Sequence, residues 1–246
     1  MSIITYGKNW DRYYQRTYRE SNGKALWDVP ADRAAERDLE VFEKELPTTL
    51  PIIDLGCGTG VQTVFLAQHY PAVLGVDASE EAIQIAREAY GGDSHQFGIL
   101  DATDPKAAQA IHQELGDAHI YSRGVLHQLL KNDYEALIQT LRTLLGQKGR
   151  LYCMEVSDQI RAHFDASADD FSQLPERMRQ VFLSDLPPRG LSLEGLSSFF
   201  PEDQFRILQS GPGRLLTNLN FSDGSPIYIP AVYAIIEAIS KPPIYA

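Results

Sequence analysis

The chain has 246 residues, of which 43% are hydrophobic, and it carries a net charge of −11 with an isoelectric point near 5.0. This acidic balance argues against a nucleic-acid partner, because phosphate contacts need clustered lysines and arginines. No apolar run reaches the roughly 18 residues that cross a bilayer, and the N-terminus lacks a signal peptide's apolar segment, so we expect a single-domain, cytoplasmic protein with no membrane partner.

The N-terminal segment is rich in aromatic side chains. Those before position 20 are Tyr6, Trp10, Tyr13, Tyr14 and Tyr18. Their spacing is largely helical, which indicates an amphipathic helix packed on the core. Tyrosine and tryptophan also combine an apolar face with a polar tip, which suits the cover of a pocket. Both interpretations stay open for this segment, and a second helix is predicted over 32–46.

A glycine-rich turn follows the first predicted strand. Residues 51–55 form a short apolar run that includes Asp54, as in a parallel strand buried on both faces, and glycines then occupy positions 56, 58 and 60. Such glycines let backbone N–H groups approach a ligand, and a helix predicted over 60–69 would point its first amides at the same crevice. No Gly-Lys-Ser/Thr follows, and the G-x-G-x-G spacing departs from the dinucleotide pattern. The turn predicts a nucleotide-like cofactor without identifying it.

Strands and helices continue to alternate along the chain. A strand over 72–76 ends at Asp77, where an acid can accept a pair of ribose hydroxyls. Ser79 and Asp104 are expected to cap the helices that follow them. The other predicted strands are 95–99, 118–122 and 150–156, and the other predicted helices are 79–90, 105–115 and 132–145. This alternation predicts an α/β fold with a mostly parallel sheet and helices on both faces.

The pattern weakens after residue 157. Strand-like composition returns at 204–208 and 228–236, so two further strands are expected there, which makes seven in all. The stretch from Ser210 to Pro226 between them is polar, and its Ser-Gly-Pro-Gly start is typical of a loop. A long polar connection of this kind suits a hairpin.

Three motifs together resemble the class I S-adenosylmethionine (SAM) dependent methyltransferases. They are Asp54-Leu55-Gly56-Cys57-Gly58-Thr59-Gly60, Gly75-Val76-Asp77-Ala78-Ser79 and Leu100-Asp101-Ala102-Thr103-Asp104. The resemblance implies SAM as cofactor, S-adenosylhomocysteine (SAH) as product, and a Rossmann-like seven-stranded sheet with a C-terminal antiparallel strand. It also divides the single domain 1–246 into an N-terminal helical lid (1–47), a SAM-binding core (48–156), an insertion or cap over the acceptor pocket (157–203) and a C-terminal strand hairpin (204–246).

The same resemblance implies a set of cofactor-binding residues. The glycine turn would hold the methionine part of SAM, Asp77 the ribose hydroxyls, and Asp101 with Ala102 the adenine. The complete expected set is Asp54, Gly56, Cys57, Gly58, Gly60, Asp77, Ala78, Asp101, Ala102 and Ser122. The N-terminal aromatic residues would shape the acceptor pocket and hold the sulfonium by cation–π contact. For Asp77 and Asp101 the alternative of an acid that merely starts a helix remains open.

Two candidate catalytic residues follow the fourth predicted strand. Arg123 and His127 are four positions apart and would share a face if the segment were helical. His127 can take a proton from an acceptor oxygen, nitrogen or sulfur, or it can be a helix-start residue bonded to backbone. Arg123 either clamps an acceptor carboxylate or pairs with an acidic side chain.

These features predict a methyltransferase that acts on a small organic molecule in specialised metabolism, as a monomer or homodimer. Transfer to O, N or S by direct in-line displacement needs alignment of the acceptor more than a strong acid–base pair. Cys57 and Cys153 lack metal-ligand spacing, so no metal is expected. Two alternatives stay open, namely an NAD(P)-dependent oxidoreductase, which the glycine spacing disfavours, and a SAM-binding regulatory protein without transfer activity.

Overall fold

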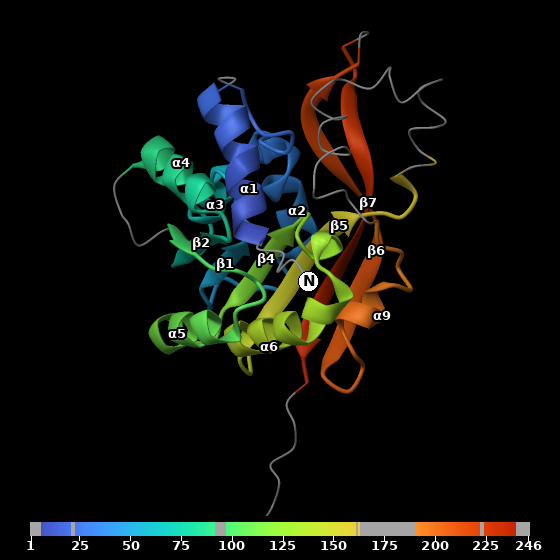
Figure 1. Cartoon of the computed structure of the whole chain (residues 1–246). Helices are drawn as coiled ribbons and strands as arrows, with labels where there is room; N and C mark the ends of the chain where they lie inside the picture. Colours follow the sequence, from blue (N-terminus) through green and yellow to red (C-terminus); the bar gives the residue numbers. More distant parts are fainter. Residues whose placement is uncertain are drawn as a thin grey trace, which may run out of the picture.

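The structure, a computed structural model, describes residues 6–20, 23–91, 97–160, 162, 190–221 and 224–239. At its centre is a seven-stranded sheet of order β3-β2-β1-β4-β5-β7-β6 (Figure 1). The strands are β1 (Ile52–Leu55), β2 (Val73–Asp77), β3 (Phe97–Ile99), β4 (His119–Arg123), β5 (Arg150–Val156), β6 (Phe205–Asn220) and β7 (Pro226–Ala238). The pairs among β1 to β5 are parallel, and β7 is antiparallel to both of its neighbours. The predicted Rossmann-like sheet with an antiparallel last strand is confirmed; residues 95 and 96 of the predicted third strand lie outside the described residues.

The helices of the structure fill the connections between strands. The described ones are α1 (Tyr6–Tyr14), η1 (Gln15–Glu20), η2 (Ala31–Arg33), α2 (Ala35–Phe42), α3 (Val61–Leu66), α4 (Glu80–Tyr90), α5 (Pro105–Leu115), η3 (Leu126–Gln128), η4 (Lys131–Asp133), α6 (Tyr134–Leu145) and α9 (Leu196–Phe199). Ser79 and Asp104 accept hydrogen bonds from first-turn N–H groups, so both predicted caps are confirmed. The helix predicted over 32–46 is broken at Ala34, whose backbone is not helical, and α2 ends at Phe42. The N–H of Ala35, free at the start of α2, donates to the side chain of Gln62 on α3.

Two apolar layers hold the helices against the sheet. One layer contains Ile53, Leu55, Ile120, Ala108, Leu137, Leu141 and Leu144. The other contains Ile52, Tyr121, Tyr152, Phe42, Leu46 and Leu66. Neighbouring residues of one strand, such as Ile52 and Ile53, enter opposite layers, as the two-residue period of a strand requires. Helices α5 and α6 therefore cover one face of the sheet, and α2 and α3 cover the other.

The C-terminal hairpin is longer than the sequence predicted. The stretch from Ser210, expected as a loop, continues β6 to Asn220 and pairs with β7. Pro212 is compatible with a strand because β6 lies at the edge of the sheet, where an N–H donor can be missing. Since β5 ends at Val156 opposite Ala231, the far half of the hairpin extends beyond the parallel strands (orange and red in Figure 1).

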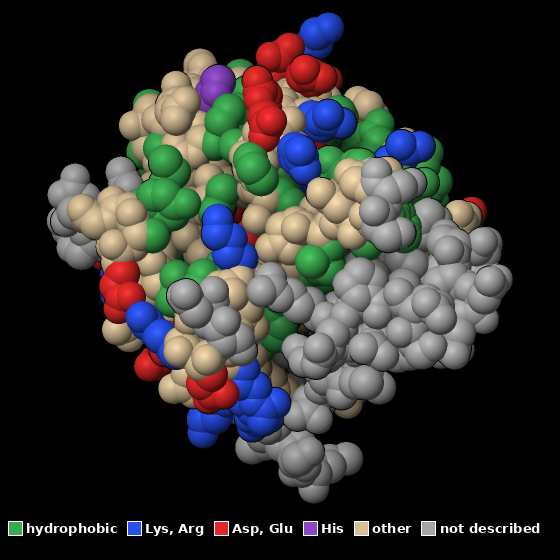
Figure 2. Space-filling view, turned by 90° about the horizontal axis from the view of Figure 1, so that it is seen from above, with side chains coloured by type: hydrophobic (Ala, Val, Ile, Leu, Met, Phe, Trp, Pro, Cys, Tyr) green, Lys and Arg blue, Asp and Glu red, His purple; other side chains and the backbone are tan. Residues whose placement is uncertain are grey.

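The face of the molecule shown in Figure 2 is mixed in character. Seen from above in Figure 2, lysine and arginine side chains lie in small groups among acidic and hydrophobic ones. Within the described ranges, no helix is both long and apolar enough to cross a membrane.

Candidate functional site

A cavity lies at the carboxyl ends of the parallel strands, where open α/β sheets bind their ligands. Of the residues singled out in the sequence, those that line it are Tyr6, Trp10, Tyr14, Asp54, Gly56, Cys57, Asp77, Ala78, Asp101, Ala102, Arg123 and His127. Those that do not line it are Gly58, Gly60, Ser122, Tyr13 and Tyr18. Ser122 is fully buried, and its hydroxyl has no hydrogen-bond partner within the described part of the chain.

The glycine turn after β1 is bonded to the end of β2. Positive φ angles occur at Gly56, Gly58 and Gly60. The N–H groups of Gly56 and Cys57 both donate to the carbonyl of Val76, at 2.8 and 3.0 Å, and the N–H of Gly58 donates to Asp77 at 2.9 Å. We expected these donors to face a ligand, but β2 and its terminal carboxylate use them instead. A turn whose N–H groups are already hydrogen-bonded within the protein is poorly suited to bind a pyrophosphate.

Because glycine has no side chain, two other segments can pack on the turn. A Cβ on Gly56 would clash with the side chain of Val125 in the loop after β4, and a Cβ on Gly58 would lie 2.7 Å from the hydroxyl of Tyr14. The glycines therefore bring the N-terminal segment and the loop after β4 together around one cavity.

Two buried carboxyl groups and one half-buried carboxyl group form an acidic wall. Asp54 accepts a hydrogen bond from Thr63 at 2.6 Å, and Asp77 accepts two backbone N–H groups at 2.9 Å. Asp28, which the sequence did not point out, lines the cavity and accepts the hydroxyl of Thr59 at 2.8 Å. Burial raises the pKa of Asp54 to about 7 and the pKa values of Asp77 and Asp28 to about 6. A cluster of carboxyl groups suits a positively charged ligand.

The aromatic segment packs over this wall. Trp10 and Trp27 make an edge contact with ring centroids 5.3 Å apart, and the indole N–H of Trp27 donates to the hydroxyl of Tyr14 at 3.3 Å. Tyr13 and Tyr18 instead accept backbone N–H groups of the following loop. Some aromatic residues of the segment thus pack it on the core, and others form a wall of the cavity.

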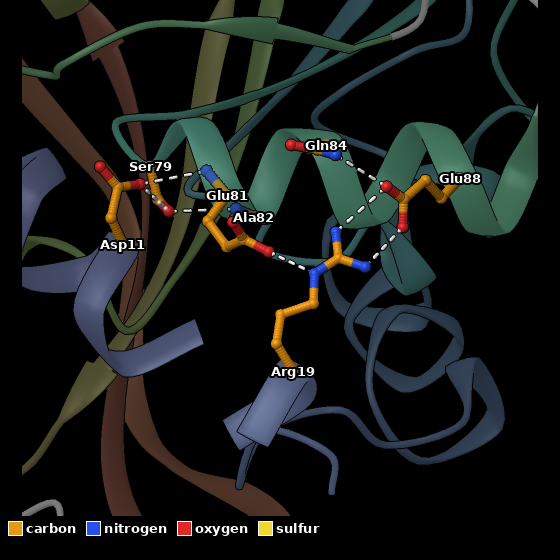
Figure 3. Close-up of polar contacts among 7 residues, drawn as sticks. All are labelled: Asp11, Arg19, Ser79, Glu81, Ala82, Gln84 and Glu88. Carbon is orange, nitrogen blue, oxygen red and sulfur yellow. Dashed lines mark hydrogen bonds and ion pairs between the residues drawn. The ribbon is translucent and has the colours of Figure 1, made fainter. Parts of the chain in front are cut away.

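Polar contacts fasten this segment to α4 (Figure 3). The carboxylate of Asp11 accepts the hydroxyl of Ser79 at 2.7 Å and the N–H of Glu81 at 3.1 Å. Arg19 forms a two-pronged ion pair with Glu88, at 2.9 and 3.1 Å, and a third bond to Glu81 at 2.7 Å. These contacts hold α1 and η1 against α4.

Arg123 is the last residue of β4, not part of a helix shared with His127 as we had considered. Its Nε lies 3.2 Å from a carboxylate oxygen of Asp38. The hydroxyls of Tyr121 and Tyr152 donate to the same carboxylate at 2.7 and 3.0 Å. An acidic partner is therefore present, while the side chain of Arg123 still lines the cavity.

His127 lies in η3, where its ring contacts a residue that the sequence analysis missed. Its Nδ1 is 2.8 Å from Oε2 of Glu155 on β5. We had weighed a bond from His127 to backbone, but the partner is this carboxylate. An acid in the otherwise apolar run 151–156 is the signal that would have identified Glu155.

Comparison with known proteins gives consistent matches. Residues 28–208 match a family described as "Methyltransferase domain". The crystal structure of a SAM-dependent methyltransferase from Anabaena variabilis ATCC 29413 is similar, with a TM-score of 0.86 and 32% identity over 96% of each chain. Magnesium protoporphyrin IX methyltransferase of Synechocystis PCC 6803, solved with bound SAH, shares the fold at a TM-score of 0.56 and 17% identity, over 94% of this chain and 97% of that one.

A curated relative is also similar over part of its length. Juvenile hormone acid O-methyltransferase of Bombyx mori is 30% identical over 102 residues, which are 40% of this chain and 35% of that protein. The chain spans less than half the length of the curated relatives it matches.

Proposed function

Since this chain belongs to the methyltransferase-domain family and is a SAM-dependent methyltransferase, we propose that it transfers the methyl group to an O, N or S atom of a small organic molecule. Family membership overturns the alternative of an NAD(P)-dependent oxidoreductase. One observation carries the proposal. The same cavity is lined by the acidic wall at the glycine turn and by apolar side chains of the C-terminal hairpin.

The residues at the acidic end fit SAM. Bound SAM supplies a methyl group on a positively charged sulfur that needs no further activation. Asp77 would hold the ribose hydroxyls, because a carboxylate with two N–H donors still has lone pairs to spare. Asp101 with Ala102 would border the adenine. Asp54 and Asp28 would face the methionine part, whose ammonium group their negative charge favours.

The other end of the cavity suits an apolar acceptor. Its apolar lining residues among those described are Leu26, Trp27, Val156, Ile160, Leu215, Leu216 and Ile229, and Thr217 lines the cavity beside them. Most of the cap expected at 157–203 lies outside the described residues. Alignment of the acceptor against these walls and exclusion of water by the aromatic segment are the main contributions we assign to the protein.

A screen with labelled SAM tests this proposal. The purified chain is incubated with apolar phenols, thiols, amines and carboxylic acids, and with a peptide panel in parallel. We expect label in a small molecule. For His127→Ala we expect slower turnover with little change in SAM affinity; an unaltered rate would assign the histidine to structure. Cofactor binding without transfer to any acceptor would favour the regulatory alternative, and label in peptides alone would contradict the proposal.

A further inference from the structure

Glu155 is the most completely buried acid beside the cavity. It lies on β5 with no exposed surface, and its carboxylate makes three polar contacts with the loop after β4, two of them as the acceptor of backbone N–H groups. The N–H of Val125 donates to Oε1 at 3.3 Å, and the N–H of His127 donates to Oε2 at 3.1 Å. The third contact is the one with Nδ1 of His127, at 2.8 Å. Because a buried charge is costly unless it is hydrogen-bonded, these donors account for its presence.

This arrangement fixes the state of the imidazole. An ionised carboxylate only accepts hydrogen bonds, so the proton of the neutral ring lies on Nδ1. Nε2, on the far side of the ring, then has a free lone pair. His127 lines the cavity, and among the described residues Nε2 has no hydrogen-bond partner. Because His127 lines the cavity and its Nδ1 is held by Glu155, Nε2 is the ring nitrogen left to meet an acceptor there.

We infer that Glu155 is a positioning residue that keeps Nε2 of His127 free as a base, and that the acceptor is a neutral hydroxyl or thiol rather than a carboxylate. This inference rests on the proposed function. As the acceptor O–H or S–H bond breaks, its proton goes to Nε2, and its electron pair forms the new bond to the methyl carbon. The electrons of the broken carbon–sulfur bond stay on sulfur and neutralise it. The negative charge of Glu155 stabilises the imidazolium that forms.

The charges of the cavity favour the same acceptor class. A carboxylic acid has already lost its proton at neutral pH, with a pKa of about 4, and needs no base. It needs a cation instead. The only lysine or arginine in the described lining is Arg123, and Asp38 already lies 3.2 Å from its guanidinium.

Imidazole ¹⁵N NMR of the full chain at pH 8 tests the positioning role without any acceptor. Comparison with His127→Gln identifies the ring among the six histidines. We expect Nδ1 to be protonated and Nε2 unprotonated. A proton on Nε2, whether alone or together with one on Nδ1, would overturn the inference, because no free base would face the cavity.

Kinetics of Glu155→Gln supply a second readout. We expect kcat to fall about 10- to 100-fold, with KM and SAH affinity nearly unchanged, since the ring loses its fixed orientation. Glu237→Gln, a half-buried and ion-paired acid on β7, is the matched control. Equal loss in both variants would contradict a positioning role. If Glu155→Gln does not fold, the NMR of the natural chain still decides.

A matched set of probes tests the acceptor class. 2-Naphthol, 2-naphthalenethiol and 2-naphthoic acid share one apolar body and differ in the reacting group. We expect labelled methyl in the naphthol or the thiol, and a loss of about 100-fold or more in His127→Gln. The inference would be overturned if naphthoic acid were methylated faster than the naphthol and the thiol, or if His127→Gln left the rates unchanged. Transfer to none of the three would count against the proposed apolar acceptor, while the NMR result would judge Glu155 separately.

Discussion

Replacing Gly7 with alanine should open the aromatic segment while leaving the sheet intact. Gly7 lies where α1 crosses the loop between β2 and α4, and a Cβ there would lie 2.4 Å from the carbonyl oxygen of Ala78. An ordinary contact begins near 3.4 Å, so α1 must move outward by the difference, about 1 Å. That displacement is enough to break short hydrogen bonds that α1 makes.

Two such bonds set the size of the effect. The hydroxyl of Tyr6 donates to Asp133 at 2.6 Å, and Asp11 accepts the hydroxyl of Ser79 at 2.7 Å. At about 0.5 to 1.5 kcal/mol each, their loss costs about 1 to 3 kcal/mol, which corresponds to SAH binding weakened about 5- to 150-fold.

Calorimetric titration with SAH measures this change. Gly98→Ala on β3 is the matched control, because a Cβ there would meet its nearest atoms at 3.8 and 3.9 Å. We expect it to bind SAH like the natural chain. Thermal melting should show a fall of about 2 to 12 °C for Gly7→Ala, at about 2 to 4 °C per kcal/mol for a chain of this size. Natural SAH affinity in Gly7→Ala, or an equal loss in Gly98→Ala, would refute the reasoning.

Three further predictions concern the charged groups. Asp77→Ala should weaken SAM binding at least tenfold, about 1.4 kcal/mol, by calorimetry; unchanged affinity would remove Asp77 from the site. Burial raises the pKa of Asp54 from its ordinary 3.8 to about 7. Between about pH 4 and pH 7 the folded chain therefore keeps a proton that the unfolded chain loses. Asp54 thus makes the ligand-free fold less stable as the pH rises through this range. As that carboxylate ionises, the affinity for cationic SAM should rise relative to that for SAH in parallel titrations between about pH 5.5 and 8, and a flat ratio would argue against an acidic wall. Arg19→Gln should speed SAH release roughly twofold at low salt in stopped-flow traces, because exposed ion pairs contribute little. Salt screens these ion pairs, so the difference from the natural chain should vanish at high salt. A difference that persists at high salt would assign Arg19 another role.

What the sequence predicted well is local. The alternation of strands and helices, the glycine turn ending at Gly60 and the acid at the end of β2 all follow from short-range rules that one segment can satisfy alone. The residue pattern of 105–115, with Asp104 as its cap, predicted the bounds of α5 correctly.

The missed features depend on partners distant in the chain. Residues 210–220 look like a loop until β7 pairs with them at the sheet edge. The N–H groups of the glycine turn looked free because the carbonyl of Val76 that accepts two of them lies on another strand. Asp28 and Glu155 could not be identified as site residues from the sequence, because their partners Thr59 and His127 are distant in the chain.

The central claim is that the acidic wall and the glycine turn hold SAM, and one measurement tests it most directly. The purified chain is titrated by calorimetry with SAH and, in parallel, with NADH. The account predicts micromolar binding of SAH and none of NADH. Binding of NADH in place of SAH, or of neither, would contradict it.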